Sequence, residues 1–157
     1  MIMGKFGTTT SQRRKIDMSI AFYLTLKSDV IYETPDATVR QLMERMDHHT
    51  LTAIPILDYA GMYVGTVTEG DILRRIHKLK STQVFKDLEK LTVIDIERRK
   101  RYDPVRIDAD LRDLLFIVEH QNFVPVVDDQ GIFIGIIKRS DVIRKLSDMI
   151  HQSTLPE

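Results

Sequence analysis

The chain contains no cysteine and carries no net charge, with 23 basic and 23 acidic residues. Without cysteine, disulfide bonds and thiolate metal sites are excluded. The balanced charge leaves no global basic field, so nucleic acid is an unlikely partner. No apolar run approaches the roughly 20 residues that a membrane-spanning helix needs, and the N-terminus has no apolar stretch typical of a secretory signal. We therefore expect a cytoplasmic protein that has no membrane partner.

What the chain does contain is an internal repeat. Residues 54–75 (IPILDYAGMYVGTVTEGDILRR) and 124–145 (VPVVDDQGIFIGIIKRSDVIRK) align without a gap at an offset of 70, and six of the 22 pairs are identical. Residues 36–43 and 108–115 align at an offset of 72. Two copies of one supersecondary unit predict one compact fold with a pseudo-twofold axis. A site between the copies is then expected to occur twice.

Each repeat has the pattern strand–helix–strand–strand–helix, which predicts an α+β fold. Apolar side chains at Val39, Leu42, Met43 and Met46 follow the period of a helix, and glycines at matched positions indicate hairpin turns. For the first repeat we expect strand 30–32, helix 37–48, strands 53–57 and 62–67, and helix 69–80. For the second we expect strand 104–107, helix 111–120, strands 124–127 and 132–137, and helix 141–150.

The composition also divides the chain into regions. Residues 1–17 are polar, belong to neither repeat and are expected to be a dispensable flexible tail. A charged connector at 81–101 separates the repeats; its residues 85–91 favour a short helix, and 93–96 are apolar enough to dock on the second repeat. The predicted regions are therefore an N-terminal tail at 1–17, a first repeat at 18–80, a connector at 81–101, a second repeat at 102–151 and a C-terminal tail at 152–157.

Three short motifs occur in both copies. They are an apolar-Pro-apolar-apolar-Asp strand, two glycines at fixed spacing, and a box of the form Gly-apolar-apolar-Ser/Thr-x-x-Asp. The box is GTVTEGD at 65–71 and GIIKRSD at 135–141, where Lys138 replaces the hydroxyl residue. Over about residues 21–149 these motifs resemble the cystathionine-β-synthase (CBS) domain family, arranged as a tandem pair, or Bateman module.

The resemblance implies two intertwined repeats with two clefts that bind adenine-containing ligands. It also implies association into flat, disk-like dimers, so we expect a homodimer. No metal is expected, because adjacent His48 and His49 cannot share an ion on a helix and no zinc motif is present. No catalytic motif is found, so we expect a binding protein with no required cofactor and not an enzyme.

Asp71 and Asp141 each stand where a helix follows a returning strand. A carboxylate there can accept both hydroxyls of a ribose, and the free N–H groups of the helix start suit a phosphate. The same residues also fit a structural role, because Thr68 and Asp71 form the pattern of a capping box and Ser140 that of a helix cap. By the resemblance, the ribose contact maps onto the two aspartates.

Neighbouring residues extend each candidate site. Gly70 permits close approach of a ligand to the backbone, and Thr68 offers a hydroxyl contact to phosphate or ribose. Lys138 and Arg139 suit a phosphate, although for Lys138 alone a solvated charged edge is the favoured interpretation. We expect tighter phosphate binding at the Asp141 cleft because of Arg139. A simple nucleoside would instead favour the more family-like box at Asp71.

By the resemblance, the wall that holds the adenine comes from the opposite repeat. For the Asp141 cleft it comprises Leu26, Ile31, Tyr32, Leu51 and Thr52. For the Asp71 cleft it comprises residues 103–105 with Gln121, Asn122 and Phe123. For Ile31 and Leu51 an ordinary core position is an equally good interpretation.

The basic run at 98–101 (RRKR) is most simply a solvated linker; a phosphate contact in a cleft and a nucleic-acid contact are the alternatives. The sequence thus predicts a regulatory protein that senses an adenine nucleotide, such as AMP, ADP, ATP or cyclic di-AMP, and modulates an unknown partner protein. Two alternatives stay open: an interaction and dimerisation module without a ligand, and a sensor of S-adenosylmethionine.

Overall fold

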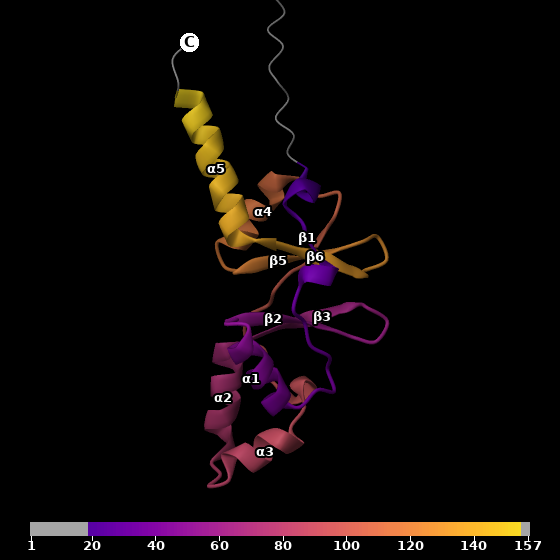
Figure 1. Cartoon of the computed structure of the whole chain (residues 1–157), viewed down its shortest axis with the longest axis vertical. Coiled ribbons are helices and arrows are strands. Elements are labelled where there is room, and N and C mark those ends of the chain that lie inside the picture. The colour runs from indigo at the N-terminus through magenta and orange to yellow at the C-terminus, as the bar shows by residue number, and fades with distance from the viewer. Residues whose placement is uncertain (1–18, 155–157) are drawn as a thin grey trace, which may run out of the picture.

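The structure is a computed structural model that describes residues 19–154. The predicted N-terminal tail and the last three residues lie outside the described residues. Two layers are stacked on one another, with the strands facing the middle of the molecule and the helices on the two outer sides (Figure 1). The predicted α+β fold of two intertwined repeats is confirmed.

The first repeat comprises α1 (Val39–His48), β2 (Ala53–Leu57), β3 (Tyr63–Thr68) and α2 (Glu69–Leu79). β2 and β3 pair in antiparallel fashion, and the buried face of α1 packs on them. The strand predicted at 30–32 is wrong, because only Glu33 pairs with Ile56, through a single parallel bridge. A longer ladder would need an N–H from Pro55, which proline lacks.

The second repeat comprises β4 (Val105–Arg106), α4 (Leu111–Val118), β5 (Phe123–Val127), β6 (Phe133–Lys138) and α5 (Arg139–Thr154). β5 and β6 are antiparallel and β4 is parallel to β5. α5 runs four residues beyond its predicted end at residue 150.

A third segment, at the N-terminal end of the described chain, joins the second repeat. It comprises η1 (Ile20–Tyr23), β1 (Thr25–Leu26) and η2 (Lys27–Asp29). β1 pairs with β6, and Ile20 is fully buried in the second core. A Cβ atom at Gly135 would lie 2.1 Å from the carbonyl oxygen of Thr25. Glycine at this position therefore permits β1 to lie against β6.

The connector makes the reciprocal crossing. Its predicted short helix is confirmed as α3 (Val84–Lys90), which is followed by η3 (Val93–Asp95). The prediction that residues 93–96 dock on the second repeat is wrong, because Val93 and Ile96 are buried in the first core. The Val93 N–H donates to the carbonyl of Ala37 at 2.9 Å. The docking is on the first repeat because the two repeats exchange their leading segments. The segment before each repeat packs in the core of the other repeat.

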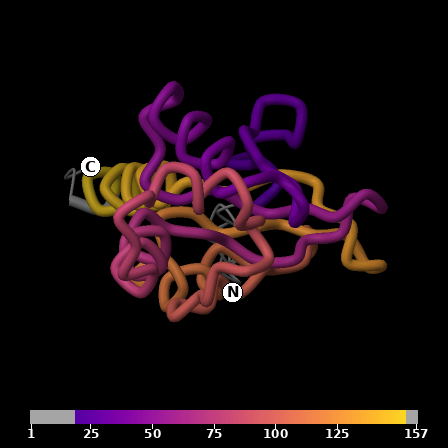
Figure 2. The backbone as a smooth tube through the Cα atoms, turned by 90° about the horizontal axis from the view of Figure 1, so that it is seen from below, coloured from indigo at the N-terminus to yellow at the C-terminus, as the bar shows by residue number. Residues whose placement is uncertain are grey.

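The two layers also meet directly. Both hairpin tips project on the same side of the molecule (Figure 2), and the N–H of Phe133 donates to the carbonyl of Gly61 at 2.9 Å. At another contact, the Asn122 amide donates to the Thr52 hydroxyl at 3.1 Å. Thr52 and Asn122 occupy equivalent positions in the two repeats, so this hydrogen bond lies near the pseudo-twofold axis. Together these contacts fix the position of one repeat against the other.

Candidate functional site at the start of α2

A cleft with a volume of about 470 Å³ opens where α2 begins. Its walls come from both repeats and from the connector between them. The lining residues are Thr52, Thr68, Glu69, Gly70, Arg74, Arg99, Lys100, Tyr102 and Asn122. Because the cleft joins three parts of the chain, a molecule bound there would contact all of them.

Asp71 is the third residue of α2 and closes the predicted capping box. It does not line the cleft itself, but it lines a separate small cavity together with Arg74 and Arg99, which line both. Its carboxylate accepts from the Thr68 N–H at 3.0 Å and from the Thr68 hydroxyl at 2.8 Å. In return the Asp71 N–H donates to the Thr68 hydroxyl oxygen at 3.3 Å. These bonds satisfy backbone groups that the start of a helix leaves free.

The second oxygen of the Asp71 carboxylate is also engaged. It accepts from Nη2 of Arg74 at 2.5 Å and from the backbone N–H of Arg99 at 3.3 Å. Burial alone would raise the pKa of Asp71, but the hydrogen bonds from Thr68, Arg99 and Arg74 outweigh it and hold the pKa below its usual 3.8. The side chain has no exposed area. Asp71 therefore fastens the connector to the first repeat.

The connector brings cations to the cleft. Arg99 and Lys100 line it, and both also line a second cavity of about 430 Å³ that continues past Gly65 and Thr66. Within residues 19–154, Arg98, Arg99 and Lys100 form no salt bridge, whereas Arg101 pairs with Asp103 at 2.7 Å. The basic run thus places exposed positive charge beside α2, where sequence alone left its role open.

The second repeat supplies the remaining wall. Tyr102 is buried, and its ring packs on that of Phe123 with centroids 5.3 Å apart. Gln121 is buried and accepts from the N–H of Asp103 at 2.9 Å, so it holds the end of the connector in place. Of the residues predicted for this wall, Asn122 lines the cleft. Tyr102 was missed by the sequence reasoning, although its place directly after the basic run is a usable signal.

The start of α5 differs from that of α2. The helix begins at Arg139, so Ser140 lies inside the first turn and is not its cap. The Arg139 side chain donates to the side-chain oxygen of Asn122, and its N–H donates to the Asn122 carbonyl at 3.1 Å. Lys138 is exposed. Asp141 stays partly exposed, and its carboxylate is 3.6 Å from Nη1 of Arg144.

The residues predicted for the adenine wall of the Asp141 cleft are spread over several environments. Ile31 and Leu51 pack against the first core, as an ordinary core position requires. Tyr32 packs near Phe133, with the Lys27 ammonium 5.6 Å from the centre of its ring. Leu26 is exposed on β1 opposite Gly135.

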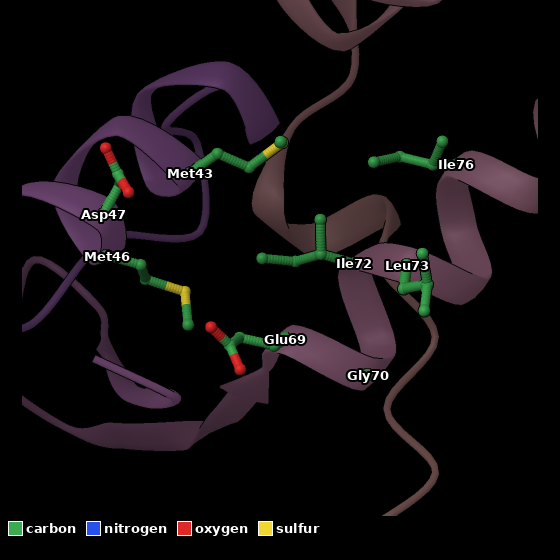
Figure 3. Close-up of a pocket in the computed structure, with 8 residues that line it drawn as sticks. All are labelled: Met43, Met46, Asp47, Glu69, Gly70, Ile72, Leu73 and Ile76. Carbon is green, nitrogen blue, oxygen red and sulfur yellow. The ribbon is translucent and has the colours of Figure 1, made fainter. Parts of the chain in front are cut away.

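A groove of about 550 Å³ lies between α1 and α2 (Figure 3). Its apolar lining includes Met43, Met46 and Ile72, and Leu73 is 68% exposed. Glu69 and Gly70 line this groove as well as the cleft. The first turn of α2 therefore separates an apolar surface from the charged site.

Comparison with known proteins decides the family. The model of the CBS domain family matches residues 24–78 and 93–148, one match for each repeat. The chain belongs to the CBS domain family. The predicted tandem arrangement of CBS domains is therefore confirmed.

This CBS pair is similar to several known proteins. A 17.7 kDa protein from Acidianus ambivalens, uncharacterized, is 25% identical over 117 residues, which is 73% of this chain and 66% of that protein. The crystal structure of CbpB from Listeria monocytogenes in complex with c-di-AMP has a TM-score of 0.73 at 20% identity and covers 85% of this chain and 98% of that one. The structure of CBSX2 in complex with AMP has a TM-score of 0.66 at 22% identity; the match covers 83% of this chain and 97% of CBSX2.

The chain spans between 22% and 66% of the length of the first curated relatives that it matches. The structural likenesses lie below 25% identity and show the fold of the CBS pair.

Within residues 19–154, no three His, Asp or Glu side chains gather in a group that would hold a metal ion. In the same range, no helix is both long and apolar enough to cross a membrane.

Proposed function

We propose that this CBS pair binds a phosphate-bearing adenine nucleotide in the cleft at Asp71 and so regulates a partner protein. One observation carries the proposal: the start of α2, the basic connector and the second repeat enclose a single cleft. Proteins of the same fold have been crystallised with c-di-AMP and with AMP. In this role the chain is a binding protein and has no catalytic activity.

The chemistry of the cleft suits each part of a nucleotide. The side chains of Arg99 and Lys100 would hold phosphate oxygens by charge-assisted hydrogen bonds. Thr68 and Asp71 would hold the ribose hydroxyls. The base would lie toward the wall of Tyr102 and Asn122, since nucleotide bases bind against largely apolar surfaces with a few polar groups.

Such a ligand would act as a bridge between the repeats. It would favour one arrangement of the two repeats over others, which is a shift of populations. A partner protein that recognises that arrangement would then respond to the nucleotide concentration. The partner is a separate protein, and the cytoplasmic location stays a prediction.

We propose that the Asp71 cleft is filled before the Asp141 cleft. Arg139 predicts tighter phosphate binding at the Asp141 cleft, but its guanidinium is engaged with Asn122. At the offset of 72, residues 26–29 (LKSD) are the counterpart of the basic run 98–101 (RRKR). Residues 26–29 carry one cation and one anion in place of four cations. A phosphate at the Asp141 cleft would therefore be attracted less strongly. Asp141 stays a proposed second site.

A panel of ligands tests the proposal. Thermal unfolding and calorimetry should be measured with AMP, ADP, ATP, cyclic di-AMP and S-adenosylmethionine. We expect the phosphate-bearing ligands to stabilise the fold by about 2.7 kcal/mol at 100 times their Kd. Their affinities should also fall with added salt. If none of the ligands changes the unfolding temperature, the chain is an interaction module without a ligand.

We further propose a homodimer. Large apolar side chains are exposed on three helices: Leu73 at 68%, Phe116 at 81% and Ile143 at 55%. Exposed apolar patches of this kind mark protein interfaces. Light scattering at micromolar concentration should give twice the chain mass of 18.2 kDa. A single-chain mass at that concentration would contradict the proposal.

A further inference from the structure

We infer that Arg74 is a latch that makes the Asp71 cleft selective for phosphorylated ligands. Arg74 holds the carboxylate of Asp71 while the cleft is empty. A phosphate draws the guanidinium away and leaves Asp71 free for the ribose. The inference rests on the proposed nucleotide site and adds to it a residue that distinguishes a nucleotide from a nucleoside.

In this structure the carboxylate of Asp71 is closed to a ligand. Its side chain has no exposed area. One carboxylate oxygen accepts two hydrogen bonds from Thr68, and the other accepts one from Arg74 and one from Arg99. A carboxylate offers about four acceptor positions. A ribose hydroxyl can therefore bind only after one of these donors has left.

Of the groups that donate to Asp71, Arg74 is the one most easily removed. The two Thr68 bonds belong to the helix cap, and the Arg99 bond comes from the backbone. The Arg74 side chain is 36% exposed and lines the cleft. Its Nε atom is buried, and within the described residues it has no hydrogen-bond partner. A guanidinium with an unused donor gains most from a phosphate, which accepts several hydrogen bonds from one arginine.

Gly70 leaves room for the guanidinium of Arg74. A Cβ atom at this position would lie 3.2 Å from Nη1 of Arg74. That distance is shorter than an ordinary van der Waals contact, so a side chain there would displace the flexible guanidinium by a few tenths of an ångström. The glycine therefore serves the arginine as well as any approaching ligand.

The second repeat provides an internal comparison. At the offset of 70, Asp141 and Arg144 correspond to Asp71 and Arg74, and Ser140 stands where Gly70 does. There the carboxylate and the guanidinium are 3.6 Å apart, and their side chains are 27% and 73% exposed. This distance exceeds that of a hydrogen bond. The latch is therefore a property of the first repeat only.

Calorimetry with adenosine and AMP tests the latch in three proteins: the wild type, Arg74→Ala and the matched control Arg144→Ala. In Arg74→Ala we expect adenosine to bind about tenfold more tightly, because Asp71 is already free, and AMP about tenfold more weakly, because a phosphate contact is lost. The ratio of the two affinities should fall about 100-fold. Arg144→Ala should keep the wild-type ratio.

A second variant, Gly70→Ser, tests the latch even if Arg74→Ala disturbs the fold. Gly70→Ser keeps both members of the latch but crowds the guanidinium, and it should shift the ratio in the same direction by a smaller factor. An unchanged ratio in Arg74→Ala, or an equal fall in Arg144→Ala, overturns the latch while AMP binding still supports the nucleotide site. If the wild type binds neither compound at millimolar concentration, the proposed function fails and the latch fails with it.

Discussion

Replacing Asp71 by alanine should lower the free energy of unfolding by about 3 kcal/mol, which is the largest stability change that we expect. The change removes the helix cap, worth about 1 kcal/mol, and charge-assisted bonds from Arg74 and Arg99, worth about 1.5–3 kcal/mol. In a chain of this size the melting temperature should fall by about 6–12 °C. Thermal and urea unfolding measure the effect.

The matched control is Asp141→Ala. Its carboxylate is partly exposed and only 3.6 Å from Arg144, so we expect a loss of at most about 1 kcal/mol. Equal losses in the two variants would mean that the Asp71 network adds nothing to stability. The comparison also guides ligand studies, because weaker binding by Asp71→Ala reflects both a lost contact and a loosened connector.

Acid should remove the difference in unfolding free energy between the wild type and Asp71→Ala. The pKa of Asp71 is lower in the folded chain than the usual 3.8 of an unfolded aspartate. A carboxyl group of this kind contributes its full stability above the unfolded pKa, and the contribution is lost as the pH falls through the folded value. The unfolding free energies of the two proteins should therefore differ at pH 7 and converge as the pH falls below 3.8.

Neutralising the basic connector should cause the largest loss of binding. The triple variant Arg98→Gln, Arg99→Gln and Lys100→Gln removes three cations that line the two cavities. At about 1 kcal/mol for each exposed charge contact, ATP affinity should fall about 100-fold. Fold stability should change little, because none of the three side chains forms a salt bridge within residues 19–154.

Lys27→Gln is the control for this experiment, because Lys27 stands in the counterpart of the basic run beside the second repeat. It should leave ATP affinity within about twofold of the wild type. Titrations at two salt concentrations give a second readout, since the triple variant should lose most of the salt dependence. An unchanged ATP affinity in the triple variant would show that the connector is a solvated linker.

The local structure of both repeats could be predicted from the sequence with few errors. β2 was predicted at its observed bounds, and the hairpins and helices lie within a few residues of their expected places. The Thr68–Asp71 capping box follows from four residues in a row. The strand predicted at 30–32 failed for a reason also written in the sequence, because Pro55 has no N–H for the neighbouring strand.

The candidate site was predicted only in part. Asp71, Thr68 and Gly70 share a short motif, so their proximity follows from the chain itself. Arg74 is also near in sequence, but its pairing with Asp71 depends on a side-chain conformation that a pattern does not specify. Arg99, Lys100 and Tyr102 reach the cleft only because the connector crosses to the first repeat.

The sequence by itself determined the repeated unit, its hairpins and its helix start, because hydrogen bonds and apolar periodicity within about ten residues encode them. Only the tertiary structure decided which core each leading segment completes. Ile20 is buried in the second core and Val93 in the first, although both are simply apolar in sequence. Burial of apolar surface is non-directional and does not specify its partner. That exchange brings the basic connector to Asp71 and makes the two clefts unequal.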